Sequence, residues 1–152
     1  MMSRFFLRPS GRVGDGRRTH VAIGPYELHV LRTMRPHLML IGPAAVTRKV
    51  IHDLGRAFLS PTMTWRSAGR LILPTEADAR TLILEGIQNL SMEEQQQLCE
   101  WLPRVIGSIQ VVSTSNAPLL PLVEEGRFLD TLYYRINLLY VPCHAVRASP
   151  GE

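Results

Sequence analysis

The sequence predicts an α/β fold, a three-layer sandwich with a five-stranded, mainly parallel sheet. Short apolar runs alternate along the chain with segments of helical period, which is the pattern of strand–helix–strand crossover units. The apolar runs are almost uninterrupted, as expected of strands that helices cover on both faces. Prolines mark the same boundaries, because they fall between the proposed elements at Pro36, Pro61, Pro74, Pro103 and Pro118.

Five strands and five helices follow from this pattern. The predicted strands are residues 37–42, 62–66, 81–87, 108–116 and 137–143. The predicted helices are residues 25–34, 45–58, 91–102, 119–125 and 128–135. The third helix has the clearest start, because Ser91 is followed three residues later by Glu94, the spacing of a capping box.

Length and composition are typical of one globular domain, since the chain has 152 residues, of which 45% are hydrophobic and 20% charged. We expect a flexible basic arm over residues 1–20, a core domain over residues 21–145 and a flexible tail over residues 146–152. No apolar run approaches the roughly 18 residues of a membrane helix, and no signal-peptide core precedes the domain. We therefore expect no membrane partner and a cytoplasmic address.

Charge and cysteine content narrow the classes of site. The net charge is +4, and sixteen of the seventeen basic residues are arginine, the exception being Lys49. Cys99 and Cys143 are too few for a disulfide framework or a four-ligand metal site, so no metal is expected. The arm carries five arginines that could bind nucleic-acid phosphates, but it lacks interleaved aromatic stacking residues. We therefore expect the arm to be a solubilising segment and not a nucleic-acid-binding one.

The segment after the first predicted strand, residues 42–49 (GPAAVTRK), opens a helix. A phosphate-binding loop needs glycine at both ends, then a lysine and a hydroxyl. Only Gly42 is in place, because Thr47 stands at the second glycine, Arg48 at the lysine and Lys49 at the hydroxyl. Residual contact with a nucleotide is one interpretation of Arg48 and Lys49, and two solvated charges on the first turn of a helix is the other.

A resemblance to a known family appears in the second half of the chain. Residues 126–137 (GRFLDTLYYRIN) closely resemble the GRFREDLYYRLN signature of the AAA+ domain of sigma-54-dependent transcription activators. Residues 81–90 (TLILEGIQNL) resemble that family's Walker B strand, TLFLDEIGEL, and residues 111–116 (VVSTSN) its sensor strand, VIAATN. The resemblance implies a P-loop NTPase fold of the AAA+ large-subdomain type.

Several functional positions of the family are changed. Glu85 stands for the first Walker B acid, but Gly86 replaces the catalytic glutamate, so the resemblance implies that hydrolysis by the usual route is lost and that no catalytic residue is left. Of the two arginines that members supply across the subunit interface, Leu129 replaces the first and Arg135 keeps the second. The implied vestigial nucleotide site consists of Gly42, Thr47, Arg48, Lys49, Glu85 and Asn116, the last at the sensor position.

Some of these residues also have structural interpretations. Glu85 can be a polar residue at the end of a buried strand, and Asn116 a strand-end residue that satisfies backbone groups. Arg135 can be stacked on tyrosine or paired with Asp130 or Glu124.

Two pieces of the family are absent from the sequence. Members carry an insertion with a GAFTGA loop, which touches the sigma factor, whereas only about fifteen residues separate Arg66 from Thr81. The chain also stops after the fifth predicted strand, without the helical lid or a helix-turn-helix. We expect a minimal AAA+ core, and the sequence leaves open whether it is a complete product or a fragment of a longer regulator.

The leading functional hypothesis is a catalytically degenerate domain that acts in transcriptional regulation through protein–protein interaction. Its expected partner is an intact AAA+ activator or a second copy of the chain, and its expected interface contains Arg127 and Arg135. One alternative is an ATP-binding domain with residual ATPase activity, in which Lys49 and Glu85 are displaced substitutes and ATP with magnesium is the cofactor. The second alternative is a nucleic-acid-binding module that uses the basic arm.

Overall fold

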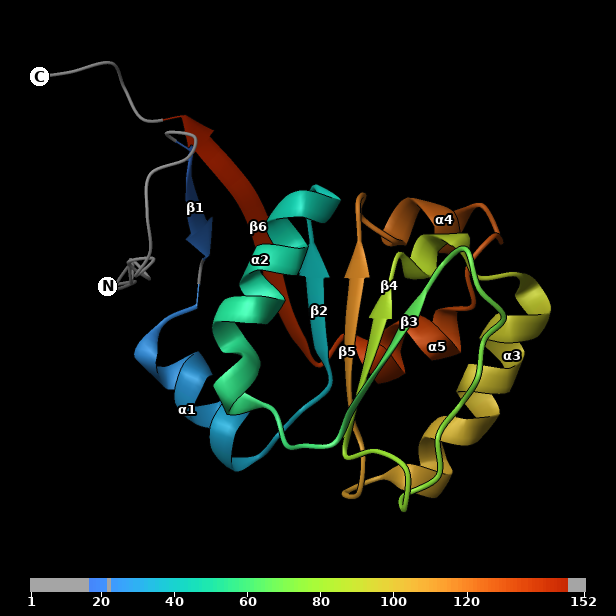
Figure 1. Ribbon diagram of the computed structural model, residues 1–152. Coiled ribbons are helices and arrows are strands. Elements are labelled where there is room, and N and C mark those ends of the chain that lie inside the picture. The colour runs from blue at the N-terminus through green and yellow to red at the C-terminus, as the bar shows by residue number, and fades with distance from the viewer. Residues whose placement is uncertain (1–16, 22, 148–152) are drawn as a thin grey trace, which may run out of the picture.

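The sheet has six strands in the computed structural model, which describes residues 17–21 and 23–147 (Figure 1). The strand order is β1-β6-β2-β5-β4-β3; β1 is antiparallel to β6, and every other neighbouring pair is parallel. The strands are β1 (Arg17–Val21), β2 (Leu38–Ile41), β3 (Thr62–Arg66), β4 (Thr81–Glu85), β5 (Gln110–Ser115) and β6 (Leu139–Arg147). The predicted α/β fold with a five-stranded parallel sheet is therefore confirmed.

All five predicted helices are present, with ends that differ from the predicted ones by a few residues. They are α1 (Pro25–Thr33), α2 (Ala44–Leu54), α3 (Met92–Trp101), α4 (Leu120–Glu124) and α5 (Asp130–Ile136). Short 3₁₀ turns, Gly55–Ala57, Ile87–Asn89 and Leu102–Val105, account for most of the excess length in the predictions. The capping box of α3 is formed, because the side chains of Ser91 and Glu94 each accept a hydrogen bond from the other's backbone N–H.

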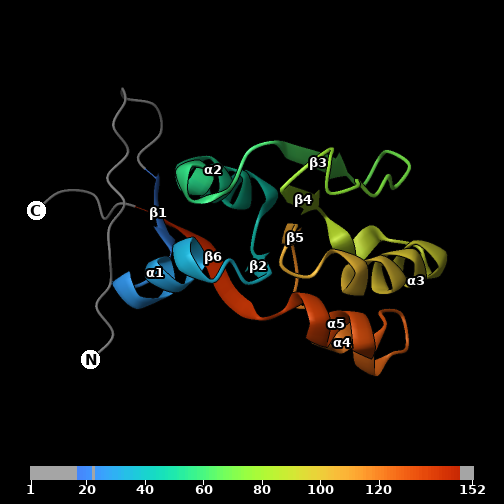
Figure 2. The ribbon, with the colours of Figure 1, turned by 90° about the horizontal axis from the view of Figure 1, so that it is seen from below.

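The sheet separates two apolar layers, as a three-layer sandwich requires. Successive residues of one strand point to opposite faces. Met39 and Ile41 accordingly pack in the layer with α3 and α5, and Leu38 and Leu40 pack in the layer with α1 and α2. Figure 2 shows α2 on one side of the sheet and α3 and α5 on the other.

Helix α2 shows why the sequence folds this way locally. Val46, Val50 and Leu54 recur every four residues, so they form one apolar stripe along the helix. All three are buried against the sheet, whereas Arg48 is exposed. The helix that follows Gly42 and Pro43 is therefore held in place by ordinary amphipathic packing.

Strand β1 was not predicted, and it corrects the predicted limits of the arm and the tail. Residues 17–20 were expected in the flexible arm and residues 146 and 147 in the tail, but they pair with each other and their neighbours in an antiparallel ladder. The physical reason is that β6 would otherwise be an edge strand, and β1 satisfies the outward hydrogen-bonding groups of its residues 143–147. The rest of the predicted arm and tail, residues 1–16 and 148–152, lies outside the described residues.

Neither a membrane-spanning helix nor a metal centre is found in the part of the chain that the structure describes. None of its helices is long and apolar enough to cross a bilayer. No cluster of three or more histidine, cysteine, aspartate or glutamate side chains is placed to hold a metal ion there.

Candidate functional site

A crevice lies at the carboxyl ends of the parallel strands, beside the start of α2. Open α/β sheets bind ligands at this edge, where the strand order reverses. The crevice holds about 230 Å³, and β2, β4 and β5 end there. Five of the six predicted nucleotide-site residues line it, Gly42, Thr47, Arg48, Glu85 and Asn116.

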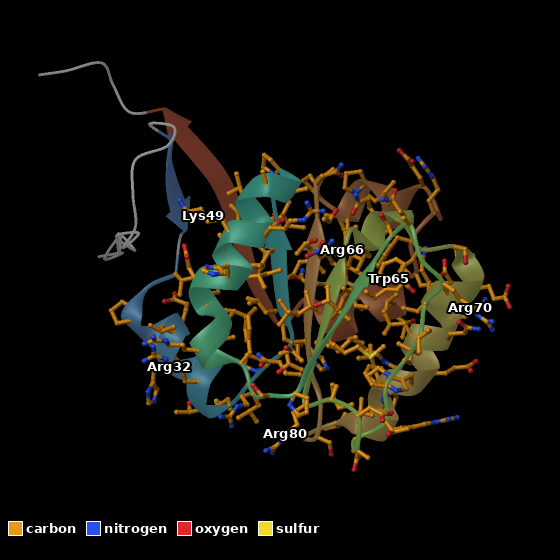
Figure 3. The ribbon with its side chains drawn as sticks, in the orientation of Figure 1. Arg32, Lys49, Trp65, Arg66, Arg70 and Arg80 are labelled. Atoms are coloured by element: carbon orange, nitrogen blue, oxygen red, sulfur yellow. The ribbon has the colours of Figure 1, made fainter. Side chains whose placement is uncertain are left out.

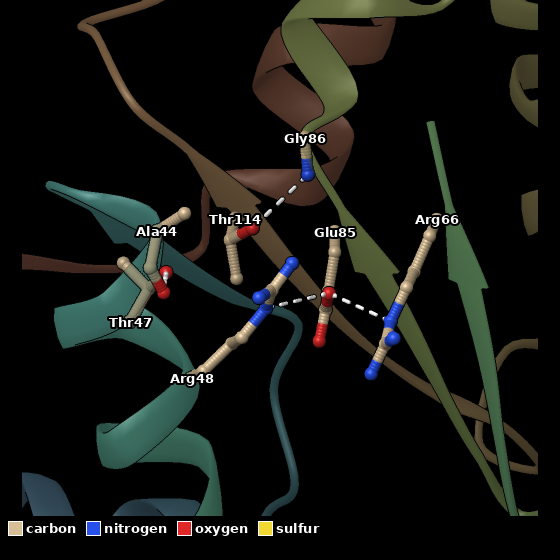
Figure 4. A network of polar contacts seen from close by, with 7 residues as sticks. All are labelled: Ala44, Thr47, Arg48, Arg66, Glu85, Gly86 and Thr114. Carbon is tan, nitrogen blue, oxygen red and sulfur yellow. Dashed lines mark hydrogen bonds and ion pairs between the residues drawn. The ribbon is translucent and has the colours of Figure 1, made fainter. Parts of the chain in front are cut away.

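Glu85 is held between two arginines across this crevice. Its Oε2 accepts a hydrogen bond from Nε of Arg48 at 3.3 Å and forms an ion pair with Nε of Arg66 at 3.2 Å (Figure 4). The Glu85 side chain is only 14% exposed, while both arginines reach into solvent. The carboxylate that would order a magnesium shell is therefore already neutralised by the protein itself.

Arg66 was missed by the sequence analysis, although a signal for it exists. Strands β3 and β4 are adjacent, parallel and both five residues long, and Arg66 is the register partner of Glu85. The two strands end in residues of opposite charge, Arg66 and Glu85. Aligning the carboxyl ends of the two predicted strands would have placed this pair side by side.

The start of α2 is the second feature that decides what the crevice can bind. The helix begins at Ala44, directly after Pro43, so no extended glycine-rich loop separates it from β2. The N–H groups of Val46 and Thr47 donate to the Pro43 carbonyl, and Oγ1 of Thr47 donates to the Ala44 carbonyl. A phosphate cradle needs several unpaired N–H groups that curl around the anion. The residues present therefore do not fit the triphosphate of ATP in the way that a Walker A loop does.

Gly42 has a packing role in this structure. A Cβ atom at Gly42 would overlap the carbonyl oxygen of Cys143 on β6. The N–H of Gly42 donates to the Ser115 carbonyl at 2.9 Å, which ties the end of β2 to β5. Cys143 is buried, and burial raises the pKa of its thiol to about 11. The one glycine that matches a phosphate loop is thus explained by the close approach of two strands.

Gly86, at the position of the family's catalytic acid, adopts a left-handed conformation with φ of 77°. Its N–H donates to Oγ1 of Thr114 at 3.0 Å, so the backbone after β4 is tied to β5. Side chains other than glycine are strained in this conformation. The turn after Glu85 is therefore built around a glycine and supplies no second carboxylate.

Lys49 and Asn116, the remaining predicted residues, differ in their placement. Asn116 is exposed at the rim of the crevice, where β5 ends. Lys49 does not line the crevice, and Figure 3 shows it on the side of α2 that is nearer β1. Lys49 therefore lies away from the crevice, because successive helix residues are about 100° apart and Arg48 takes the crevice side, and its role as a displaced phosphate-binding lysine stays a prediction.

The predicted interface residues lie on the segment around α5. Arg127 is exposed and contacts Oε2 of Glu125 at 3.4 Å. The sequence analysis offered Asp130 or Glu124 as partners of Arg135, but Nη1 of Arg135 donates to the carbonyl oxygen of Cys99 on α3 at 2.6 Å. Asp130 instead accepts from its neighbour Thr131.

Gln95 on α3 is a second residue that the sequence analysis missed. Its buried amide donates to the carbonyls of Leu90 and Arg127, both at 3.1 Å, and accepts from the N–H of Leu129 at 2.8 Å. These bonds fix the turn that leads into α5. A glutamine in a predicted amphipathic helix gives no sign of such a role, because two of its three partners are backbone groups 32 and 34 residues away.

Comparisons with known proteins agree with this architecture. The sequence model of a family described as Sigma-54 interaction domain matches residues 38–143, well over half of the chain. The HTH-type transcriptional regulatory protein TyrR of Haemophilus influenzae is 33% identical over 82 residues, which are 47% of this chain and 26% of that protein. The pathogenicity locus probable regulatory protein HrpS of Pseudomonas savastanoi pv. phaseolicola is 24% identical over 93% of this chain and 49% of its own length. The chain thus spans at most about half of these curated relatives.

Solved structures show the same fold at low sequence identity. NtrX from Brucella abortus in complex with ATP superposes with a TM-score of 0.63 and 18% identity, over 76% of this chain and 34% of that chain. The P-loop NTPase domain of the sigma-54 transport activator from E. coli superposes with a TM-score of 0.57 and 15% identity, over 78% of this chain and 89% of that chain. These likenesses confirm the P-loop NTPase fold that the resemblance implied.

Proposed function

Because the chain belongs to the Sigma-54 interaction domain family, we propose that it acts in transcription regulation by binding a protein partner, without hydrolysing ATP. The observation that carries the proposal is the bridge in which Arg48 and Arg66 hold Glu85 across the crevice. An acid whose negative charge is already balanced by two guanidinium groups attracts a magnesium shell less strongly than a free carboxylate does.

Two further features of the crevice support the proposal that the domain neither binds nor hydrolyses ATP. The N–H groups of Val46 and Thr47 at the start of α2 are used within the helix, and Gly86 supplies no carboxylate to polarise water. The crevice holds about 230 Å³, which is below the roughly 300 to 1,000 Å³ of typical small-molecule sites. A nucleotide would have to break the bridge and unwind the first turn of α2 before it could bind.

The interface we propose is the exposed side of the segment from Arg127 to Arg135. The segment is anchored from below, because Gln95 holds its backbone and Phe128 and Leu132 are buried in the core. Its other side presents Arg127 and Tyr134 to solvent. A rigid, exposed segment of this kind suits binding to an intact AAA+ activator, the partner we propose.

The absence of nucleotide binding is tested by comparing thermal unfolding of the full chain with and without millimolar Mg-ATP. Ligand that binds the native state must raise the Tm, by the equivalent of about 2.7 kcal/mol at a hundredfold excess over Kd. We expect Mg-ATP to leave the Tm of the wild type unchanged. We expect the same for Arg66→Ala, because the loop before α2 lacks a phosphate cradle even when one arginine of the bridge is removed. An ATP-dependent rise in the wild-type Tm would contradict the proposal.

Partner binding is tested separately with an intact sigma-54 activator from the same genome. We expect the chain to alter the ATPase rate of that activator in a concentration-dependent way and Arg127→Glu to abolish the effect. Arg70→Glu is the matched control, since Arg70 is equally an exposed arginine but lies in the loop between β3 and β4 (Figure 3). Equal activity of Arg127→Glu and Arg70→Glu would exclude the proposed interface.

A further inference from the structure

A larger cleft of about 830 Å³ lies at the opposite edge of the sheet, where the parallel strands begin. It is lined from the end of α1, the loop before β5 and the end of α5. Figure 3 shows Arg80, one of its lining residues, at the other end of the sheet from Arg66. The cleft is therefore separate from the Glu85 crevice.

The rim of this cleft carries an unusual concentration of exposed apolar side chains. Met34, Ile106, Tyr134 and Leu138 all line it, and their side chains are between 62% and 77% exposed. Single exposed apolar residues are normal on a protein surface, but a contiguous group around one cleft marks an interaction site.

The charged residues of the cleft all have one sign. Arg35, Arg80 and Arg135 line it, and no aspartate or glutamate of residues 17–21 and 23–147 does. Within the described residues, neither Arg35 nor Arg80 forms an ion pair. The cleft therefore combines apolar contact surface with positive charge that the rest of the described domain does not neutralise.

Arg35 sits at a backbone position that is unfavourable for arginine. It follows α1 with φ of 48°, and its N–H donates to the Val30 carbonyl, as in a helix end that normally carries glycine. A non-glycine residue in the left-handed region is strained, and such strain concentrates at functional sites. The strain is an independent reason to assign the Arg35 side chain a binding role.

We propose that this cleft binds an acidic amphipathic helix of a protein partner. Apolar side chains on one face of such a helix would cover Met34, Ile106 and Leu138, and carboxylates beside that face would pair with the arginines. A helix fits better than an added strand, because the cleft lies at strand ends and offers no free sheet edge. The inference rests on the part of the proposed function that gives the domain a protein partner, and it specifies the chemistry of that partner.

Other occupants fit the charges less well. A second copy docked by two-fold symmetry would place the same arginines against each other. The N-terminal residues 1–16 include Arg4, Arg8 and Arg12, which repel the cleft. A small ligand enclosed in the cleft would leave the projecting rim side chains uncovered.

The test uses the full chain and a fluorescein-labelled designed peptide of about 14 residues, or four helical turns, with leucine at helical spacing and glutamate beside it. Fluorescence anisotropy measures its Kd. We expect saturable binding, and at least tenfold weaker binding of the same peptide with lysine in place of glutamate. Absence of binding, or equal binding of the lysine peptide, would overturn the proposal.

Two variants of the protein locate the binding. Ile106→Asp is expected to raise the Kd at least tenfold, while Ile72→Asp, at an isoleucine 60% exposed outside the cleft, leaves the Kd unchanged. Equal effects of the two would overturn the assignment. Self-association that Ile106→Asp abolishes, without peptide binding, would assign the cleft to a second copy and also overturn it.

Arg35→Gly separates a binding role from a structural one. Glycine relieves the left-handed strain, so we expect a higher Tm together with a weaker peptide complex. A higher Tm with unchanged Kd would remove Arg35 from the site and overturn its assigned role. None of these readouts depends on nucleotide or on the ATPase of an activator, so the cleft and the proposed function can fail separately.

Discussion

The crevice around Glu85 and the segment from Arg127 to Asn137 both resemble the family, but the structure uses the two regions differently. In the crevice the polar groups pair with one another, because Glu85 forms ion pairs with both Arg48 and Arg66. In the segment, the matching residues Phe128 and Leu132 are buried in the core. The difference teaches that the segment that matches the family most strongly packs in the core, whereas the polar groups of the crevice pair with one another.

The largest effect should come from Gly42→Ala, although Gly42 lies at the crevice. The new Cβ would overlap the Cys143 carbonyl and force β2 away from β6, so we expect a loss of about 4 kcal/mol or more, or no folded protein. Urea unfolding followed by circular dichroism measures it. Gly55→Ala is the matched control, because no atom lies within 4 Å of a Cβ built there. Equal, small losses of stability in both variants would contradict the packing role of Gly42 and favour a role in ligand binding.

Gln95→Ala should have the next largest effect and tests the other side of the comparison. It leaves the Arg127 carbonyl and the Leu129 N–H without their partners, so we expect a loss of about 3 kcal/mol. Gln97→Ala, at an exposed glutamine on the same helix, should change the free energy of unfolding by less than about 0.5 kcal/mol. If the two variants unfold alike, the segment is not held from α3.

Much of the fold could be predicted from the sequence because it depends on local patterns. The capping box at Ser91 and the stripe of Val46, Val50 and Leu54 are set by spacing within one helix, and the structure has both. Strand β1 could not be predicted, because its hydrogen bonds are to residues 143–147, more than 120 residues away along the chain.

The candidate site was predictable to a similar depth. Glu85 and Arg48 were identified from motif positions, and both line the crevice. Their ion pairs depend on which side of α2 faces the sheet and on the register of β3 with β4. The same is true of Gln95, whose partners are distant backbone groups. Pairings across elements require the topology, and a motif does not contain it.

Alkaline pH should show that the apolar core beside Gly42, where Cys143 is buried, is dry. Burial raises the pKa of Cys143 to about 11, so the native state keeps a proton that the unfolded state loses near pH 9. The stability from this group is complete below pH 9 and is lost as the pH rises towards 11, by about 2 kcal/mol. Unfolding of the wild type and of Cys143→Ala between pH 8 and about 11 measures the difference. Parallel pH profiles would indicate a hydrated thiol and a loosely packed core beside Gly42.

Glu85→Gln should have the smallest effect, less than about 1 kcal/mol, because both arginines of the bridge are exposed and surface ion pairs contribute little. Gln95 and Glu85 each join several partners, but only the partners of Gln95 are backbone groups that lose their hydrogen bonds when the side chain is removed. Raising the salt concentration in wild-type unfolding should reproduce a similarly small loss, since salt screens exposed charges. If Glu85→Gln lowers the free energy of unfolding as much as Gln95→Ala does, the bridge is a main source of the sheet's stability. Pairing in the crevice would then stabilise the fold as strongly as packing does in the segment.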